Sequence, residues 1–136
     1  MFWDLGCGAG KCMLAAAFAM PDLKEINGVE YLEGVYNCAV QAGERFRKVT
    51  NVPMNIIHGD MLEVDWSDAD LIFTSSICFP QELIDGIWEK AKLLKIGTKI
   101  VSLKSFDDCD DWEIIHNLRV KMTWGKTGVY ILEKIK

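Results

Sequence analysis

Short apolar segments with the composition of β-strands alternate with segments of helical spacing along the first hundred residues. The strand-like segments are residues 2–5, 25–30, 54–58, 71–74 and 99–103. Strands that alternate with helices are typical of βαβ units, whose parallel strands share one sheet. The pattern therefore predicts an α/β fold with a mostly parallel sheet.

Three helices are expected between these strands. Residues 11–20 are so rich in Cys, Met, Leu, Ala and Phe that we expect a helix buried on most sides, ending at Pro21. A third helix should begin with Pro80 as its first residue and end before Gly97, with its apolar positions at Leu83, Ile87, Ala91 and Leu94. The second, over residues 32–49, is amphipathic, and its predicted buried stripe is Val35, Ala39, Ala42, Phe46 and Val49.

The pattern changes after residue 103. Residues 112–122 and 127–135 are strand-like and flank Trp124-Gly125-Lys126, which predicts an antiparallel hairpin instead of another crossover helix. The 136 residues suffice for one hydrophobic core and are too few for two. We therefore expect a single domain, residues 1–136, whose sheet ends in a hairpin.

Composition and charge narrow the range of partners. A net charge of −5 argues against direct binding of nucleic acid and suits a small molecule or a basic protein better. The chain lacks the apolar run of about 18 residues expected of a membrane span. The aspartates at 107, 108, 110 and 111 predict a solvated loop. Five cysteines without a C-x-x-C pair predict reduced, buried thiols in the cytoplasm or nucleus: Cys7, Cys12, Cys38, Cys78 and Cys109.

A glycine-rich loop follows the first strand-like segment. Asp4-Leu5-Gly6-Cys7-Gly8-Ala9-Gly10 leads from a strand into a helix, and its glycines allow the backbone to turn sharply and approach a ligand closely. In an NAD site the third glycine of G-x-G-x-x-G would fall at Lys11. The loop predicts a ligand above it, and its spacing disfavours a nucleotide-binding oxidoreductase. Taken alone, it is also compatible with a plain strand-to-helix turn.

Polar residues end the next three strands. Glu30 could accept hydrogen bonds from both ribose hydroxyls of an adenosine, or it could be an ordinary solvated residue. Asp60 could accept a hydrogen bond from an adenine amino group while Met61 packs on the ring. Ser75 and Ser76 lie where the reacting end of a ligand belongs, although serine is equally common there as a helix cap.

The order and spacing of these elements resemble class I S-adenosylmethionine-dependent methyltransferases. A narrower resemblance, to the disruptor-of-telomeric-silencing family of non-SET histone lysine methyltransferases, runs through the whole chain. The similar blocks are residues 2–11, Gly28-Val29-Glu30, His58-Gly59-Asp60-Met61-Leu62, residues 75–79, residues 97–106 and residues 123–130.

This resemblance implies a Rossmann-like class I methyltransferase fold, a mostly parallel seven-stranded sheet with helices on both faces. It implies S-adenosyl-L-methionine as cofactor and a protein lysine as methyl acceptor. Ser75, Ser76 and Trp124 would contribute to catalysis, with Trp124 and Tyr130 walling an acceptor channel and Phe79 near its floor. The implied cofactor-binding residues are Asp4, Gly6, Gly8, Gly10, Lys11, Glu30, Asp60, Met61 and Ser75.

The chain departs from the family pattern at two places. Ser75-Ser76 replaces an Asn pair, and Met1 stands directly before the first strand, where the family carries a segment that covers the methionine end of the cofactor. We therefore expect either a fragment of a longer protein or a small divergent protein with a more open site. The acceptor could thus be a histone-like lysine, another protein or a small molecule, or the chain could be a cofactor-binding module with little activity. His58 and His116 lack a spacing suited to zinc, so we expect no metal. The oligomeric state is left open.

Overall fold

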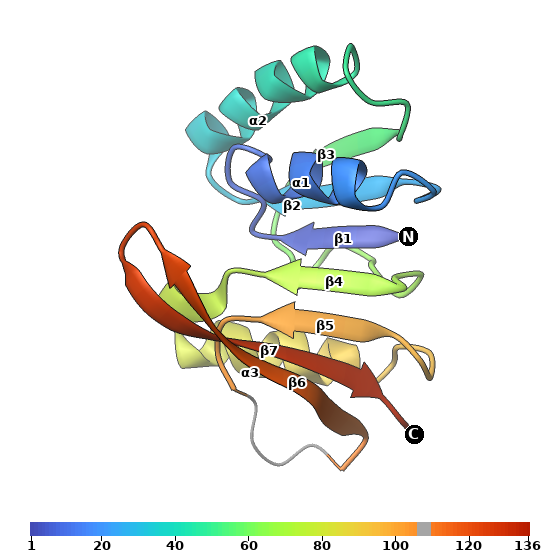
Figure 1. Ribbon diagram of the computed structural model, residues 1–136, viewed down its shortest axis with the longest axis vertical. Helices are drawn as coiled ribbons and strands as arrows, with labels where there is room; N and C mark the ends of the chain where they lie inside the picture. Colours follow the sequence, from blue (N-terminus) through green and yellow to red (C-terminus); the bar gives the residue numbers. More distant parts are fainter. Residues whose placement is uncertain (106–109) are drawn as a thin grey trace.

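The computed structural model describes residues 1–105 and 110–136. Its core is one seven-stranded sheet in the order β3-β2-β1-β4-β5-β7-β6 (Figure 1). The first five strands are parallel, and β7 and β6 run antiparallel at one edge. The strands are β1 Phe2–Leu5, β2 Ile26–Glu30, β3 Met54–His58, β4 Leu71–Thr74, β5 Lys99–Ser102, β6 Trp112–Met122 and β7 Gly125–Lys134. The predicted fold, a mostly parallel sheet that ends in a hairpin, is confirmed.

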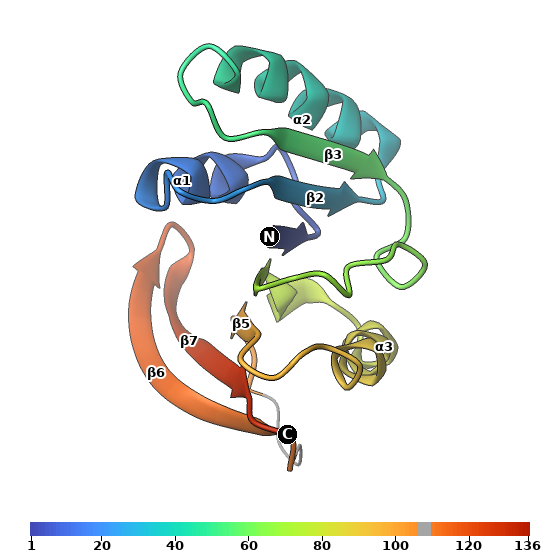
Figure 2. The same cartoon turned by 90° about the vertical axis from the view of Figure 1, so that its right-hand side faces the viewer.

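Helices cover both faces of the sheet. The helix α1 (Lys11–Ala19) lies on one face and α3 (Gln81–Ala91) on the other (Figure 2). The helix α2 (Glu33–Phe46) packs beside β3, and a short 3-10 helix, η1 (Ser76–Cys78), follows β4. None of the helices within the described residues has the length and apolar character needed to cross a membrane.

Alternate side chains along each strand build two separate cores. On the α3 side, Trp3 and Leu5 of β1 pack with residues of the neighbouring strands and with Ile84, Ile87 and Trp88 of the helix. On the α1 side, Phe2 packs with Met13 of α1 and other small or apolar residues. Because successive side chains of a strand point to opposite faces, the apolar residues of β1 serve both cores.

Several local predictions are wrong. The helix α1 is not buried on most sides, since only Met13, Ala16 and Ala17 are buried and Phe18 is 61% exposed. The helix α2 ends at Phe46, so Val49 lies beyond it and is 59% exposed. The first error arises because a helix lying on a sheet is covered on the sheet side alone, whatever its composition.

The start of α3 and the state of the cysteines also differ from expectation. Pro80 is the N-cap of α3 in an extended conformation, and the helix begins one residue later. Cys7 is buried, but Cys12, Cys38 and Cys78 are exposed, and all four thiols are free. The aspartates at 107 and 108 and the cysteine at 109 lie outside the described residues.

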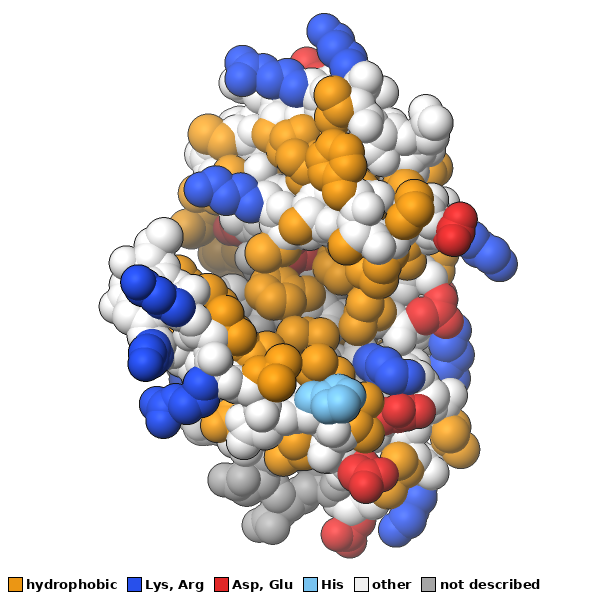
Figure 3. Space-filling view, in the orientation of Figure 1, with side chains coloured by type: hydrophobic (Ala, Val, Ile, Leu, Met, Phe, Trp, Pro, Cys, Tyr) orange, Lys and Arg blue, Asp and Glu red, His pale blue; other side chains and the backbone are white. Residues whose placement is uncertain are grey.

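The β6–β7 hairpin extends past the rest of the sheet and curves toward the side that carries α1 (Figure 2). On the face seen in Figure 3, apolar side chains gather over the middle of the molecule. The surface is hollowed between the hairpin tip and the upper part of the molecule, where the arrows of the parallel strands end in Figure 1. The carboxyl ends of the parallel strands therefore lie at the edge of the sheet where the surface opens.

Candidate cofactor cleft

A cleft of about 520 Å³ lies at the carboxyl ends of the parallel strands. The chain runs outward from β1 to β2 and β3 and then returns to β4 on the other side of β1, so the strand order reverses here. Open α/β sheets bind their ligands at such a reversal. The lining residues are Gly6, Glu30, Tyr31, Leu32, Asp60, Met61, Phe79, Pro80 and Leu83.

The glycine loop after β1 turns back beneath this cleft. Gly6, Gly8 and Gly10 have φ angles of 81°, 55° and 81°, a left-handed region that residues with a Cβ rarely adopt. The backbone N–H groups of Gly6 and Cys7 both donate to the Val29 carbonyl oxygen, at 2.9 Å each. A Cβ on Gly8 would meet no atom within 4 Å, so the backbone of this residue faces open space.

Glu30 holds the glycine loop and the next loop at fixed positions. Its Oε2 accepts a hydrogen bond from the Gly8 N–H at 3.0 Å, and its Oε1 accepts one from the Leu32 N–H at 2.9 Å. Glu30 is only 8% exposed, and it is one of the residues that line the cleft. Glu30 is therefore an oriented group and not an ordinary solvated residue.

Asp60 and Met61 follow β3 on the opposite side of the cleft. Asp60 Oδ1 accepts a hydrogen bond from the Leu62 N–H at 2.8 Å, and the Met61 carbonyl accepts one from the indole N–H of Trp66 at 2.8 Å. Both residues are thus fixed by local hydrogen bonds. The structure brings them into one cleft with Glu30 and Gly6, as the sequence predicts.

Two side chains close on Gly6. A Cβ at this glycine would lie 3.0 Å from Phe79 Cζ and 3.6 Å from Met61 Cε. The Phe79 ring contacts the backbone at the turn, and a side chain there would displace it. Gly6 is therefore required both by its φ angle and by the packing of the cleft wall.

Asp4 lies behind the loop and does not line the cleft. Its side chain is 1% exposed, and its Oδ2 has no hydrogen-bond partner within the described residues. Burial, and secondly the negative charge of Glu30, raise the pKa of Asp4 to about 7. Burial, and after it the negative charges of Asp4 and Glu30, also raise the pKa of the neighbouring Cys7 thiol to about 12. Asp4 is thus a buried carboxyl group that can carry a proton near neutral pH.

The serines predicted at this site have different environments. Ser75 is exposed, whereas Ser76 is fully buried and its hydroxyl is 2.8 Å from the Ser102 hydroxyl. Ser75 occupies the N-cap position of η1, as the helix-cap interpretation predicts, but neither η1 nor α3 has a side-chain cap hydrogen bond. Neither serine is among the lining residues of the cleft.

The remaining predicted residues are not among those that line the cleft. Gly10 is the N-cap of α1, and Lys11 is its exposed first residue. Trp124 is 64% exposed between β6 and β7. Sequence reasoning missed Tyr31, Leu32 and Leu83 as lining residues. Tyr31 and Leu32 directly follow Glu30, and this adjacency could have indicated that they line the cleft. Leu83 was predicted only as a core position of the third helix.

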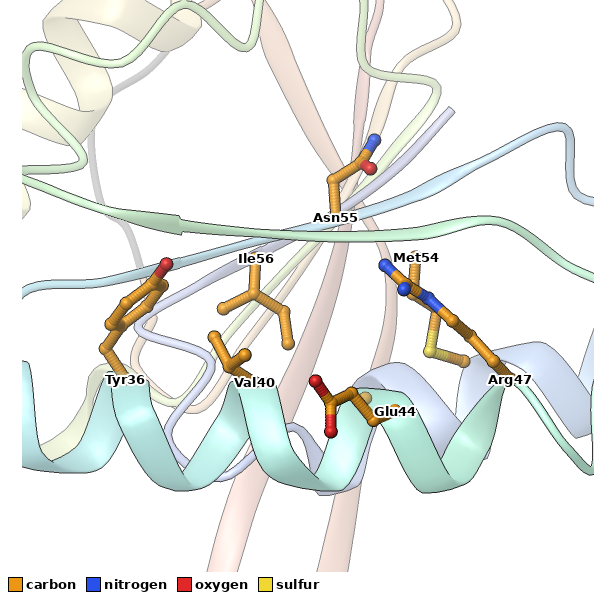
Figure 4. A pocket seen from close by; sticks show the side chains of 8 residues that line it. Tyr36, Val40, Glu44, Arg47, Met54, Asn55 and Ile56 are labelled. Carbon is orange, nitrogen blue, oxygen red and sulfur yellow. The ribbon is translucent and has the colours of Figure 1, made fainter.

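A second hollow, of about 260 Å³, lies between α2 and the edge strand β3 (Figure 4). Tyr36, Val40 and Glu44 point from the helix toward the strand there. None of the residues selected from the sequence lines it. Among the described residues, no group of three His, Cys, Asp or Glu side chains could hold a metal ion.

Solved structures with the same architecture define the class of fold. A magnesium protoporphyrin IX methyltransferase from Synechocystis PCC 6803, solved with bound S-adenosylmethionine, has a TM-score of 0.74 at 14% identity, over 98% of this chain and 69% of that one. An RNA methyltransferase from Salinibacter ruber, in complex with S-adenosyl-L-homocysteine, has a TM-score of 0.72 at 23% identity, over 99% and 80% of the two chains. The fold is that of the class I methyltransferases.

The family follows from the sequence comparison. The sequence model of the family described as "Histone methylation protein DOT1" matches residues 1–123 of this chain. The chain therefore belongs to this family. A histone-lysine N-methyltransferase of Yarrowia lipolytica, specific for lysine 79 of histone H3, is 29% identical over 116 residues. The match covers 78% of this chain and 23% of that relative, so the chain spans about a quarter of the relative's length.

Proposed function

We propose that this chain binds S-adenosyl-L-methionine in the cleft at the ends of β1, β2 and β3 and transfers its methyl group to a lysine of a basic, histone-like protein. One observation carries the proposal: Glu30 lines a single cleft beside the glycine loop together with Asp60 and Met61, which lie 30 and 31 residues further along the chain. These are the groups that an adenosine requires. Membership of the histone methylation family supports the choice of acceptor.

The residues in the cleft fit the cofactor. Each oxygen of Glu30 accepts one backbone N–H, and a carboxylate oxygen can accept a second hydrogen bond, so two ribose hydroxyls could be held. Asp60 would accept from the adenine amino group, and Met61 would pack on the ring. Gly8 leaves open space above the loop, where no Cβ hinders a close approach. Asp4, Gly10, Lys11 and Ser75 would act through the loops that they support.

The chemistry needs few dedicated groups. The bound cofactor supplies an electrophilic methyl group on a positively charged sulfur, and the acceptor amine supplies the electron pair for an in-line displacement. The protein contributes position and the exclusion of water, which account for much of the rate in such reactions. The acceptor must be neutral to attack, and apolar walls formed by Phe79 and Trp124 would lower the pKa of its ammonium group.

The charge of the chain supports a basic acceptor. At a net charge of −5 the protein attracts a lysine-rich partner and repels free nucleic acid. A histone-like acceptor also agrees with action in the nucleus, and a basic protein of the cytoplasm would be the alternative. No direct contact with nucleic acid or membrane is part of the proposal.

Ligand-dependent stability tests the cofactor assignment. S-adenosylhomocysteine at about 100 times its dissociation constant should stabilise the folded protein by about 2.7 kcal/mol and raise its melting temperature, while NAD should not. An equal shift with both ligands, or a shift with NAD alone, would contradict the proposal. Transfer of a labelled methyl group to histone octamers, lysine-free basic peptides and small amines then tests the acceptor. If only the small amines are methylated, the protein-lysine part is wrong.

A further inference from the structure

Two lysine side chains donate hydrogen bonds to backbone carbonyls of the two loops that wall the cleft. Lys104, just after β5, places its Nζ 3.1 Å from the Phe79 carbonyl oxygen. Lys90 of α3 places its Nζ 2.8 Å from the carbonyl oxygens of both Leu62 and Val64. Each contact joins positions at least 25 residues apart in the chain.

The two loops carry the side chains that close on Gly6. Phe79 Cζ and Met61 Cε would lie 3.0 and 3.6 Å from a Cβ at this glycine, one on each loop. Lys104 bonds the carbonyl of Phe79 itself, and Lys90 bonds that of Leu62, the residue after Met61. The backbone from which each wall side chain projects is therefore fixed by an ammonium group.

The described residues hold neither ammonium group in an ion pair, and the positive charge of Lys90 is only a minor cause of the lowered pKa of Asp65. Within residues 1–105 and 110–136, no carboxylate lies within ion-pair distance of Lys90 or Lys104. Both side chains are partly buried, and Lys90 also lies over the Trp66 ring, at 5.3 Å from its centroid. Ordering a lysine costs side-chain entropy, which charge-assisted hydrogen bonds to carbonyls offset.

The surroundings of Lys104 extend this connection into the sheet. Its backbone N–H donates to the Ser102 hydroxyl at 3.2 Å, and that hydroxyl is 2.8 Å from the buried hydroxyl of Ser76 in η1. The segment from Ser76 to Phe79 is thus joined to the end of β5 twice, by a hydroxyl pair and by an ammonium group. These contacts with the end of β5 therefore fix the position of the loop that carries Phe79.

We propose that Lys90 and Lys104 are positioning residues of the cofactor cleft. Each holds the backbone of one wall, so that Met61 and Phe79 keep the spacing that the cofactor requires, without touching the cofactor themselves. The inference rests on the proposed function for its ligand, but the positioning of the two walls is a property of the protein alone. Loss of either hydrogen-bonding group lets one wall move.

The experiment uses Lys104→Met, which keeps an unbranched side chain one atom shorter and removes its donors, and Lys104→Arg, which keeps donors. Lys90→Met and Lys90→Arg form the second pair. Lys92→Met is the matched control, because Lys92 caps the same helix and its Nζ pairs with exposed Glu89. Calorimetry with S-adenosylhomocysteine should show about 5- to 10-fold weaker binding for the two methionine variants, recovery with arginine, and no change in the control.

A double-mutant cycle separates positioning from a general loss of stability. If Lys104 acts through Phe79, then Lys104→Met should have no further effect on affinity in a Phe79→Ala background, whereas independent effects would add. Additive losses, or an affinity unchanged by both methionine substitutions in a protein that binds, would overturn the proposal.

A readout without ligand distinguishes this inference from the proposed function. In a spectrum of ¹³C-labelled methionine methyl groups, Met61 should shift in Lys90→Met and, because the Phe79 ring lies close by, in Lys104→Met, but not in Lys92→Met. If the wild type does not bind S-adenosylhomocysteine, the proposed function fails, yet these shifts would still support positioning. Should Lys90→Met fail to fold, the Lys104 variants decide. A Met61 signal unchanged in every folded variant refutes the inference.

Discussion

Replacing Asp4 with Asn should remove a specific pH dependence of stability. The carboxyl is 1% exposed, and burial together with Glu30 raises its pKa from 3.8 to about 7. A group with a raised pKa binds its proton more tightly in the folded state, so the free energy of unfolding falls as the pH rises from about 4 to about 7 and is level above that window. Asparagine resembles the protonated carboxyl and does not titrate.

The magnitude follows from the two pKa values. Proton binding by Asp4 contributes a factor of 1 + 10^(pKa − pH) in each state. Between about pH 5 and pH 7, the ratio of the folded-state factor to the unfolded-state factor falls by about 1.7 powers of ten, which corresponds to about 2 kcal/mol of stability lost by the wild type. Because Asp4 is fully buried, solvent screening does not reduce this figure. The two proteins should thus match only below about pH 4, and the advantage of the variant should grow by about 2 kcal/mol between about pH 5 and pH 7.

Urea unfolding of both proteins, followed by tryptophan fluorescence at several pH values, measures this difference. All other titrating groups are common to the two proteins, so their contributions cancel in the comparison. If the two stabilities change in parallel from about pH 5 to pH 7, then the Asp4 carboxyl is ionised in the folded protein. In that case a partner must compensate its burial, and the raised pKa of Asp4 is refuted.

Two further substitutions test the cleft. Glu30→Gln keeps one acceptor oxygen and the side-chain shape but loses the charge, so the dissociation constant for S-adenosylhomocysteine should rise about 10-fold or more. An unchanged dissociation constant in a folded variant would show that Glu30 does not bind the ligand. Gly6→Ala should lower stability by about 1–2 kcal/mol because of its left-handed φ, and should also abolish binding by displacing the aromatic wall. Gly34→Ala, where a Cβ meets nothing within 4 Å, is its control, and equal effects of the two would contradict the argument.

Much of the fold could be predicted because the strands are marked by local signals. The bounds of β1, β3, β4 and β6 agree with the expected segments, each of which is a short apolar or alternating run next to a turn or loop. The hairpin was predictable for the same reason, since Gly125 lies between two long strand-like runs and has a φ of 141°. One error concerns the hairpin, because Gly125 and Lys126 of the predicted turn belong to β7. The other errors concern helix ends and burial, which depend on what packs against a segment.

The candidate site was predictable in part. Glu30, Asp60 and Met61 stood out because each follows the end of a parallel strand, and such ends meet at one edge of the sheet. Leu83 did not, because its helical spacing also suits the core. Ser76 could not be told from Ser75 by position, although one is buried against Ser102 and the other is exposed.

The sequence by itself determined the backbone of the site: the glycines that permit left-handed turns after β1, the alternation of strands and helices, and the polar residues at strand ends. These are local properties, set by the conformational freedom of glycine and the periodicity of side chains. Tertiary structure alone decided which face of α1 is covered, why Asp4 holds its proton, and which carbonyls Lys90 and Lys104 hold. Burial, the electrostatic effect of Glu30 and hydrogen bonds between distant loops depend on how segments far apart in the chain come together, and no local pattern records them.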